Sequence, residues 1–298
     1  NNKTNFAIFI VLLAGIIWSF GALVVRYIED ARSVPWQYLF FRGLTIFVIL
    51  NLYLFFKEGK SFIANYKKID LSVIIGGLGF ATAFMGFIWS ITHTSAAVTL
   101  LMLAAMPFMT AILGYIFLKE KVSFTTLFSI IIAAVGIGFM AFNSSKVGTL
   151  FGLTLGLLSS LGFSIGSVSL RWNKRTPTFT TVSLAGFFCA IISFVVLIIS
   201  EQSFFTTFRN SSLSALHGTL VCSGLILYSI GSKNLPAADL TLLSLTEVLG
   251  GIFWVWLPIF GINEVPTTNT IIGGFIITFA IIYYSLNTKR KRRFIGMN

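Results

Sequence analysis

Long runs of apolar residues, separated by short polar stretches, follow one another along the whole chain. A helix that crosses a hydrocarbon core about 30 Å thick needs roughly 20 mostly apolar residues, and the runs have about this length. The alternation of polar and apolar residues that is typical of membrane β-strands is absent from the sequence. The pattern therefore predicts ten transmembrane helices, at residues 6–28, 34–56, 71–92, 95–118, 122–142, 148–171, 178–200, 212–231, 238–260 and 268–287.

Parts of the first half of the chain return in the second half. The phrase WSFGALVVRY at 18–27 returns as FSIGSVSLRW at 163–172, which pairs Ser19 with Ser164. Two further pairs keep nearly the same offset: AAVTLLMLAAMP at 96–107 with AADLTLLSLTEV at 237–248, and TLFSIIIAAVGI at 126–137 with TIIGGFIITFAI at 270–281. Three matches in the same order indicate a repeated unit of five helices.

A repeat of five helices has a topological consequence. Because five is odd, the second copy enters the membrane from the opposite side, and the two copies are related by a pseudo-two-fold axis in the membrane plane. We therefore expect an all-α integral membrane fold of ten transmembrane helices, arranged as two inverted five-helix repeats at residues 1–145 and 146–298. Two such halves can exchange an inward-open and an outward-open state, which is alternating access.

Composition agrees with a location in lipid. Hydrophobic residues make up 56% of the chain and charged residues only 10%. A water-soluble domain of this composition would carry more apolar surface than it could bury. We expect a multi-pass protein of the bacterial inner membrane, with the lipid bilayer as its surroundings.

The net charge of +12 is unevenly distributed along the chain. If the N-terminus is cytoplasmic, sixteen of the 21 basic residues lie on the cytoplasmic side, including the tail from Lys289 to Arg293. Only Arg26, Arg32, Lys146 and Arg209 then lie toward the outer side. This bias predicts cytoplasmic N- and C-termini, and it places the basic tail at anionic headgroups rather than on nucleic acid.

The sequence shows neither nucleotide chemistry nor a catalytic cluster. It contains no GxxxxGK[ST] phosphate-binding loop and no HExxH pattern, so we expect no cofactor, no metal and no enzyme activity. Transport would then draw on a gradient of substrate, proton or another ion. A scaffold or receptor that transports nothing stays open as a second class of function.

Several segments together resemble the paired EamA-type domains of the drug/metabolite transporter superfamily. They are WSFGALVVRY, Arg42, TSAAVTLLMLAAMPF, FLKEK, LPAADLTLLSLTEVLGGIFWVWLPIFGINE and IIGG, with acidic turns at Glu120 and Glu264. The resemblance implies a ten-helix transporter with predicted helices one, three, four, six, eight and nine around a cavity. Two positions depart from the family pattern: Val248 stands where Pro is frequent, and Ser129 where Gly is common. The first departure leaves open whether the ninth helix bends as the fourth does at Pro107.

Glu247 is the acidic residue with the deepest predicted position. It lies nine residues after Ala238, or about 13 Å along a helix, which is close to the midplane of the membrane. An ionised carboxylate at that depth is costly, so it faces a wet cavity, pairs with a cation or stays protonated. Binding of substrate, carriage of a proton and a structural hydrogen bond all remain open. Its counterpart in the repeat is Met106, which cannot titrate.

Arg42 is the basic residue with the deepest predicted position, about 12 Å from the outer end of the second helix. We expect it to be a structural charge, because the second helix is not implied to be a main wall of the cavity. Carbonyl groups at a helix end, Glu247 and a substrate carboxylate are its possible partners. Glu120, flanked by Lys119 and Lys121, is expected to form an ion pair or to cap a helix.

The predicted substrate site combines aromatic, methionine and hydroxyl side chains with the midplane acid. Aromatic rings can stack on a substrate, and flexible methionines suit substrates of varied shape, although both more often pack against other helices. The candidates are Trp18, Ser19, Phe84, Trp89, Met102, Met106, Ser164, Tyr228, Ser244 and Glu247. We expect a secondary transporter that exports a small polar or amphipathic metabolite, with uptake or exchange as the alternative direction. The sequence gives no oligomeric state.

Overall fold

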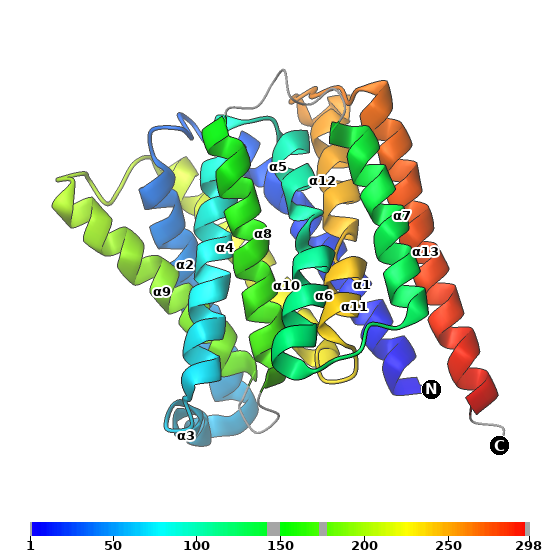
Figure 1. The fold of residues 1–298 in the computed structure, drawn as a ribbon. Coiled ribbons are helices and arrows are strands. Elements are labelled where there is room, and N and C mark those ends of the chain that lie inside the picture. The colour runs from blue at the N-terminus through cyan, green and yellow to red at the C-terminus, as the bar shows by residue number, and fades with distance from the viewer. Residues whose placement is uncertain (1, 142–149, 173–177, 296–298) are drawn as a thin grey trace.

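The computed structural model describes residues 2–141, 150–172 and 178–295, which form helices joined by short loops, with no strand in these ranges (Figure 1). The α-helices are α1 Asn2–Arg26, α2 Pro35–Glu58, α3 Ile63–Tyr66, α4 Leu71–His93, α5 Ala96–Leu103, α6 Met106–Leu118, α7 Phe124–Ala141, α8 Leu150–Trp172, α9 Thr178–Ile199, α10 Phe208–Gly231, α11 Ala237–Leu243, α12 Thr246–Trp256 and α13 Thr268–Ile295. Two short 3₁₀ turns, η1 Gly59–Phe62 and η3 Pro258–Phe260, follow α2 and α12.

The prediction of an all-helical membrane protein is confirmed. In the described part of the chain, nine spans are long and apolar enough to cross a bilayer, and α7 adds a shorter apolar stretch, Phe124–Phe139. Some boundaries differ from those predicted. For example, α10 starts at Phe208 rather than at 212, because the Thr207 side chain caps it by accepting a hydrogen bond from the backbone N–H of Asn210. The basic side chains of the tail, and Lys146, Lys174 and Arg175, lie outside the described residues.

The fourth and ninth predicted helices are each broken in the middle. One is divided into α5 and α6 at Ala104–Ala105, and the other into α11 and α12 at Ser244–Leu245. The first break precedes Pro107, whereas the second forms with Val248 at the equivalent position. The ninth helix therefore breaks without a proline, which answers the question that the departure at Val248 had raised.

The two halves of the chain are in contact along most of their helices. Helix α4 packs on α8, α10 packs on α1, α2 packs on α9, and α7 packs on α13. Helices α4 and α8 approach closely at Gly79 and Gly162, where a Cβ on Gly162 would lie 2.6 Å from the carbonyl oxygen of Gly79. Small residues permit such backbone contact in membrane helices.

The directions of the helices follow from the loops. In Figure 1, α1 and α8 run in opposite directions, and the start of α1 and the end of α13 lie at the same end of the bundle. We call the two ends of the bundle the Arg26 end, where α1 finishes, and the Arg171 end, where α8 finishes.

Candidate functional site

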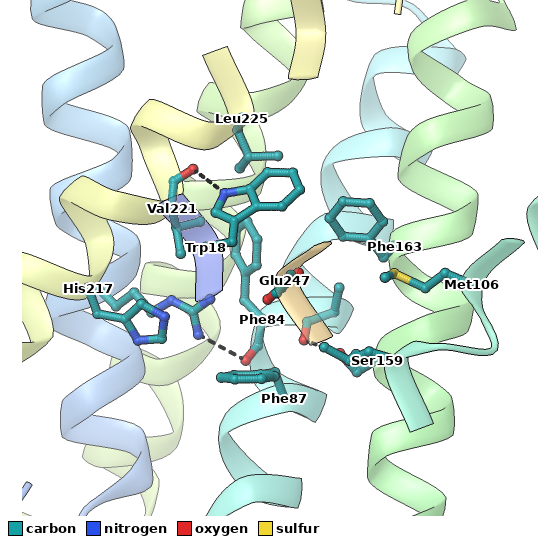
Figure 2. A pocket seen from close by; sticks show the side chains of 13 residues that line it. Trp18, Phe84, Phe87, Met106, Ser159, Phe163, His217, Val221, Leu225 and Glu247 are labelled. Carbon is teal, nitrogen blue, oxygen red and sulfur yellow. Dashed lines mark hydrogen bonds between the residues drawn. The ribbon is translucent and has the colours of Figure 1, made fainter. Parts of the chain in front are cut away.

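A small cavity of about 40 Å³ lies between the halves of the chain, near the middle of the bundle (Figure 2). Its walls come from α1, α2, α4, α5, α6, α8, α10 and α12. The lining residues are Trp18, Arg42, Ala83, Phe84, Phe87, Leu103, Met106, Ser159, Phe163, His217, Val221, Leu225 and Glu247. The helices that the resemblance implied therefore meet at this cavity, and α2 contributes Arg42 in addition.

Arg42 brings a guanidinium group into the apolar interior. The side chain is 3% exposed, and one Nη donates a hydrogen bond of 3.4 Å to the carbonyl oxygen of Phe84. The guanidinium carbon lies 5.0 Å from the ring centre of Phe84 and 5.9 Å from that of Phe87. Its Nε has no hydrogen-bond partner, and no carboxylate of the described residues lies within 4.0 Å. Most of the five N–H donors of this side chain are therefore unused.

Glu247 lines the same cavity and belongs to the second half of the chain. It is half-buried and lies in the first turn of α12. The helix dipole of α12 favours a negative charge at that position. Among the described residues its carboxylate has no hydrogen bond and no ion pair. A positive and a negative side chain thus line one cavity without being bonded to each other.

His217 also lines the cavity, and sequence reasoning missed it. It is 2% exposed, and its Nδ1 lies 2.5 Å from the hydroxyl of Tyr38. Gly21 makes room for the ring, since a Cβ there would lie 2.5 Å from Nε2. The predicted start of this helix at 212 placed His217 near the membrane surface. A start at Phe208 puts it roughly 14 Å along α10, at the depth of the cavity.

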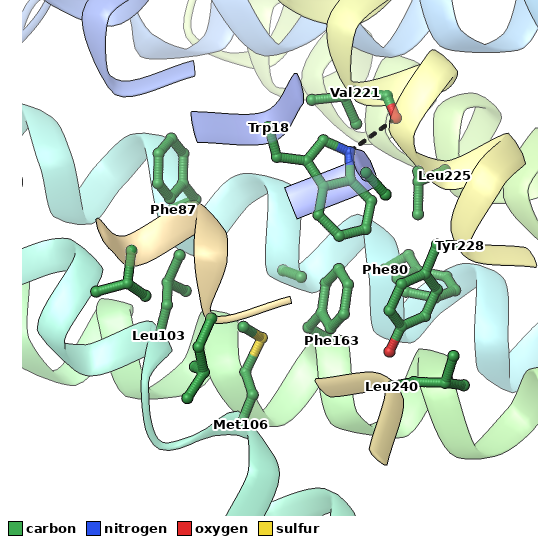
Figure 3. Packing of buried hydrophobic residues seen from close by; sticks show 14 of the residues in the cluster. Trp18, Phe80, Phe87, Leu103, Met106, Phe163, Val221, Leu225, Tyr228 and Leu240 are labelled. Carbon is green, nitrogen blue, oxygen red and sulfur yellow. Dashed lines mark hydrogen bonds between the residues drawn. The ribbon is translucent and has the colours of Figure 1, made fainter. Parts of the chain in front are cut away.

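Aromatic rings pack against one another beside the cavity (Figure 3). Trp18 and Phe163, which the repeat pairs with each other, touch edge to face with ring centres 5.5 Å apart. Phe163 also contacts Phe80 and Tyr228, with ring centres 5.2 and 5.4 Å apart. Trp18 is fixed by a hydrogen bond of 3.2 Å from its Nε1 to the carbonyl oxygen of Val221.

Four of the ten predicted substrate residues line the cavity: Trp18, Phe84, Met106 and Glu247. The three predicted serines instead bond their hydroxyls to backbone carbonyls. Ser19 donates to Ile16, Ser164 donates to Ser160 and Met106, and Ser244 donates to Thr241 beside the break of the ninth helix.

The other three predicted residues also lie outside the lining of the cavity. Trp89 packs against Trp36 and His93 at the C-terminal end of α4. Met102 packs against Gly156 of α8, and Tyr228 shares a hydrogen bond of 2.8 Å with Ser167.

An ion pair between the halves lies at the Arg26 end. Nε of Arg26 lies 2.5 Å from one carboxylate oxygen of Glu264, and the other oxygen accepts a hydrogen bond of 3.0 Å from the backbone N–H of Ala96, the first residue of α5. The Arg26 guanidinium also donates to the carbonyl oxygens of Ile91 and Thr94. The pair therefore joins the end of α1, the end of α4 and the start of α5.

The same arrangement occurs at the Arg171 end. Arg171 contacts one carboxylate oxygen of Glu120 at 2.5 and 2.6 Å, and the other oxygen accepts a hydrogen bond of 3.0 Å from the backbone N–H of Ala237, the first residue of α11. The Arg171 guanidinium also donates to the carbonyl oxygens of Ser232 and Leu235. The prediction that Glu120 forms an ion pair or caps a helix is confirmed, since it does both.

Comparison with known proteins gives a consistent result. The profile of the EamA-like transporter family matches residues 5–142, which covers α1 to α7. Three proteins described as uncharacterized transporters are similar in sequence. One from Helicobacter pylori strain J99 is 28% identical over 57% of this chain and 56% of its own length, so the match spans little more than half of that relative.

The other two relatives match over more of their length. One from Helicobacter pylori strain 26695 is 25% identical over 85% of this chain and 86% of its own, and one from Archaeoglobus fulgidus is 25% identical over 95% and 97%. A solved crystal structure of a protein superposes with a TM-score of 0.74 at 17% identity, covering 95% of this chain and 98% of that one. The last similarity concerns the fold alone.

Proposed function

We propose that the chain, whose residues 5–142 match the EamA-like transporter family, is a secondary active transporter that carries a small polar or amphipathic metabolite by alternating access. The substrate binds in the central cavity. The two Arg–Glu pairs close the two ends, and each pair separates when the cavity opens on its side. The observation that carries the proposal is the matched ion pair at each end of the bundle, with a central cavity between the two pairs.

The proposal includes the arrangement as two inverted repeats. Three kinds of matched contact support it: Arg26–Glu264 with Arg171–Glu120, the capped N-termini of α5 and α11, and the packing of α4 on α8 with that of α10 on α1. Trp18 and Phe163 meet in the middle, as paired positions near the pseudo-two-fold axis would.

Access to the cavity tests the mechanism without knowledge of the substrate. In a chain whose native cysteines Cys189 and Cys222 are replaced by alanine, Ser159→Cys places one thiol on the wall of the cavity. A membrane-impermeant maleimide is then applied to either face of oriented proteoliposomes. Glu264→Gln should raise labelling from the Arg26 face and lower it from the Arg171 face, and Glu120→Gln should do the reverse.

The reciprocal fall is the decisive part of this experiment. Alternating access requires that opening one end closes the other, because the two states share one population. If either substitution raises labelling from both faces, the cavity is a continuous pore and alternating access is wrong. If the thiol stays unlabelled in both variants, the cavity is not on a transport path.

The proposed orientation places the Arg171 end and both termini in the cytoplasm of a bacterial cell, in accordance with the charge bias. Lys67 and Ser203 are both exposed, and they lie in loops that the topology assigns to opposite faces. In intact cells, a cysteine at Ser203 should react with an impermeant thiol reagent, and a cysteine at Lys67 should not. Reaction at Lys67 alone would reverse the orientation.

The proposed direction is export, which the resemblance to drug/metabolite transporters supports. Proton coupling through Glu247 is part of the proposal. Efflux from preloaded cells, compared with uptake by the same cells, distinguishes export from the alternatives of uptake and exchange.

A further inference from the structure

We propose that a second cavity, at the Arg171 end between α6, α7 and α11, binds one sodium ion. Its ligands are the carboxylate of Asp239 and the hydroxyls of Thr126 and Thr110, which all line this cavity of about 40 Å³. The cavity shares no lining residue with the central one. Binding of the ion therefore does not depend on the substrate that the central cavity takes.

Asp239 supplies a negative charge inside the helix bundle. The residue is 6% exposed, and its two carboxylate oxygens accept hydrogen bonds from the hydroxyls of Thr126 at 2.7 Å and Tyr284 at 2.5 Å. Hydroxyl groups are neutral, so these two bonds hold the carboxylate in place without changing its charge. Glu120, the other acid of this cavity, forms an ion pair with Arg171.

Thr110 gives a second, independent indication of a ligand. Its side chain is fully buried and lines the cavity, and its Oγ1 has no hydrogen-bond partner. Threonine hydroxyls in other helices donate to the carbonyl four residues earlier, as those of Thr45, Thr82 and Thr92 do. A buried hydroxyl without a partner is costly, and coordination of a cation satisfies its oxygen.

The ligands and the size of the cavity favour sodium among the cations. Carboxylate and hydroxyl oxygens suit hard cations rather than copper or zinc. One carboxylate charge matches a monovalent ion, whereas calcium takes roughly six to eight oxygen ligands, often from several acids. A volume of about 40 Å³ has room for little more than a water molecule, which favours sodium over the larger potassium ion.

The repeat places an equivalent cavity at the Arg26 end, and its ligands differ. It retains a threonine, Thr270, at the position of Thr126. Val98 and Gly251 occupy the positions of the carboxylate and of the unpartnered hydroxyl. The equivalent cavity therefore has no carboxylate at this place, and it provides a matched control within the same chain.

Sodium binding is measured on the purified wild-type protein through its melting temperature. Sodium chloride replaces choline chloride at constant ionic strength, so that screening by salt stays the same. A ligand that binds the folded state raises the melting temperature with its concentration. We expect a rise that saturates with sodium, and we expect potassium and calcium to require concentrations about tenfold higher or more for the same rise.

Three substitutions assign the ligands. Asp239→Asn keeps an acceptor for the two hydroxyls and removes the charge, so it should weaken sodium binding about tenfold or more. Thr110→Val removes a hydroxyl that has no partner, so it should weaken sodium binding about fivefold and leave the melting temperature in choline chloride no lower than that of the wild type. Thr270→Val, in the equivalent cavity, should leave the affinity for sodium unchanged.

A bound ion would join three helices and hold the Arg171 end closed. In the protein with Ser159→Cys, sodium should therefore lower labelling from the Arg171 face about twofold or more, by shifting the population toward the closed state. Asp239→Asn should abolish this effect. Labelling that is equal in sodium and choline chloride would contradict the control of this end by the ion.

Each other outcome overturns the inference. An equal rise of the melting temperature with sodium and potassium would show no selective site, and no rise with sodium would show no site. A sodium response that persists in both Asp239→Asn and Thr110→Val would place the ion elsewhere. Lys121 also lines the cavity and is exposed, so a response that appears only in Lys121→Gln would mean that its ammonium group occupies the site. Reciprocal labelling with Glu264→Gln and Glu120→Gln needs no sodium, so failure of the cation site is distinguishable from failure of alternating access.

Discussion

The two halves of the molecule match at their ends and differ in the middle. Arg171 follows Arg26 by 145 positions and Glu264 follows Glu120 by 144, and each arginine pairs with the glutamate of the other half. In the middle, Glu247 corresponds to Met106 in the repeat. The residues that hold the ends are thus duplicated, whereas the charges of the cavity occur once each.

This difference is what the proposed transport of one substrate by alternating access would require. Both ends would have to close by the same kind of contact, and a duplicated ion pair would serve each of them. A single substrate in a central site contacts the two halves with different groups, and a duplicated charge there would leave one copy buried and unpaired. Loss of symmetry is therefore expected at the cavity and not in the ion pairs at the two ends.

The largest expected effect comes from reversing a charge in one end pair. Arg26→Glu places two carboxylates together and removes the donors for the Ile91 and Thr94 carbonyls, so we expect a loss of about 3–5 kcal/mol in the free energy of unfolding. Adding Glu264→Arg should restore part of this loss in thermal melting. The double variant cannot restore all of it, because the backbone N–H of Ala96 loses its carboxylate acceptor.

The repeat provides the matched control for that rescue. Combining Arg26→Glu with Glu120→Arg places the new arginine at the wrong end of the bundle, beside Arg171. This double variant should be no more stable than Arg26→Glu alone. Equal recovery with either arginine would show that the pairs act only through net charge and that the cross-half contacts are unimportant.

A second difference lies between the two ends themselves. At the Arg171 end, Asp239 of α11 accepts hydrogen bonds from Thr126 at 2.7 Å and Tyr284 at 2.5 Å, which ties α11 to α7 and α13. The position equivalent to Asp239 at the Arg26 end is Val98. A cavity of about 230 Å³ lies beside Glu264, against about 40 Å³ beside Glu120. The packing beside Glu264 is therefore looser than the packing beside Glu120, and no carboxylate occupies the position equivalent to Asp239 at the Arg26 end.

Asp239→Val would give the Arg171 end the residue type that the Arg26 end has at the equivalent position. It removes the carboxylate acceptor of two buried hydroxyl groups, so we expect the Arg171 end to open more easily by about 2 kcal/mol. The measurement is the labelling of Ser159→Cys from the Arg171 face, which should rise. Val98→Ala, at the equivalent position, should leave labelling from that face unchanged. If Asp239→Val raises labelling only from the Arg26 face, the conclusion that the Arg171 end is held more tightly is wrong.

Sequence reasoning predicted the helices well because hydrophobic length is a direct requirement of the bilayer. It also paired Arg26 with Arg171 and noted the acidic turns at Glu120 and Glu264. It did not predict that each arginine would pair across the halves, since a repeat gives equivalent positions and no contacts. The break of the ninth helix was left open, because no proline marks it.

The cavity was predicted only in part, for reasons that differ from residue to residue. Trp18, Phe84, Met106 and Glu247 were selected by depth and helix number, and they line the cavity. Depth alone does not fix the direction of a side chain around a helix, which is why other candidates lie elsewhere. Arg42 was given a structural role because its helix was not expected at the cavity. His217 was missed because its helix begins one turn earlier than its polar residues suggest.

Glu247→Gln tests whether the carboxylate that only the second half contributes to the cavity takes part in transport. Under the proposed proton coupling, Glu247 binds and releases a proton in each transport cycle, so net flux should depend on the pH gradient in the wild type. The amide carries no proton, and the variant should lose this dependence while exchange at saturating substrate continues. Arg42 and His217 are the other ionisable side chains that line the cavity, and both remain in the variant.

The same variant also tests the alternative that Glu247 has only a structural role. The carboxylate of Glu247 makes no hydrogen bond or ion pair with the described residues, so the free energy of unfolding of the variant should change by about 1 kcal/mol or less. A clearly lower melting temperature with intact pH dependence would mean that Glu247 ties helices together and carries no proton.

Pro107→Ala should have the smallest effect, because the second half forms the same break without a proline. Pro107 stands at the start of α6, where it lacks an N–H that the first turn would not use within the helix. Val248, its counterpart, donates its N–H to the carbonyl of Leu245, and the break between α11 and α12 persists. The alanine can make the same bond, so the free energy of unfolding should change by about 1 kcal/mol or less, and labelling of Ser159→Cys from both faces should stay within twofold of the parent. A large loss of labelling would mean that α5 and α6 fuse into one straight helix without the proline. In that case the two breaks have different causes, and the similarity of the halves does not extend to the broken helices.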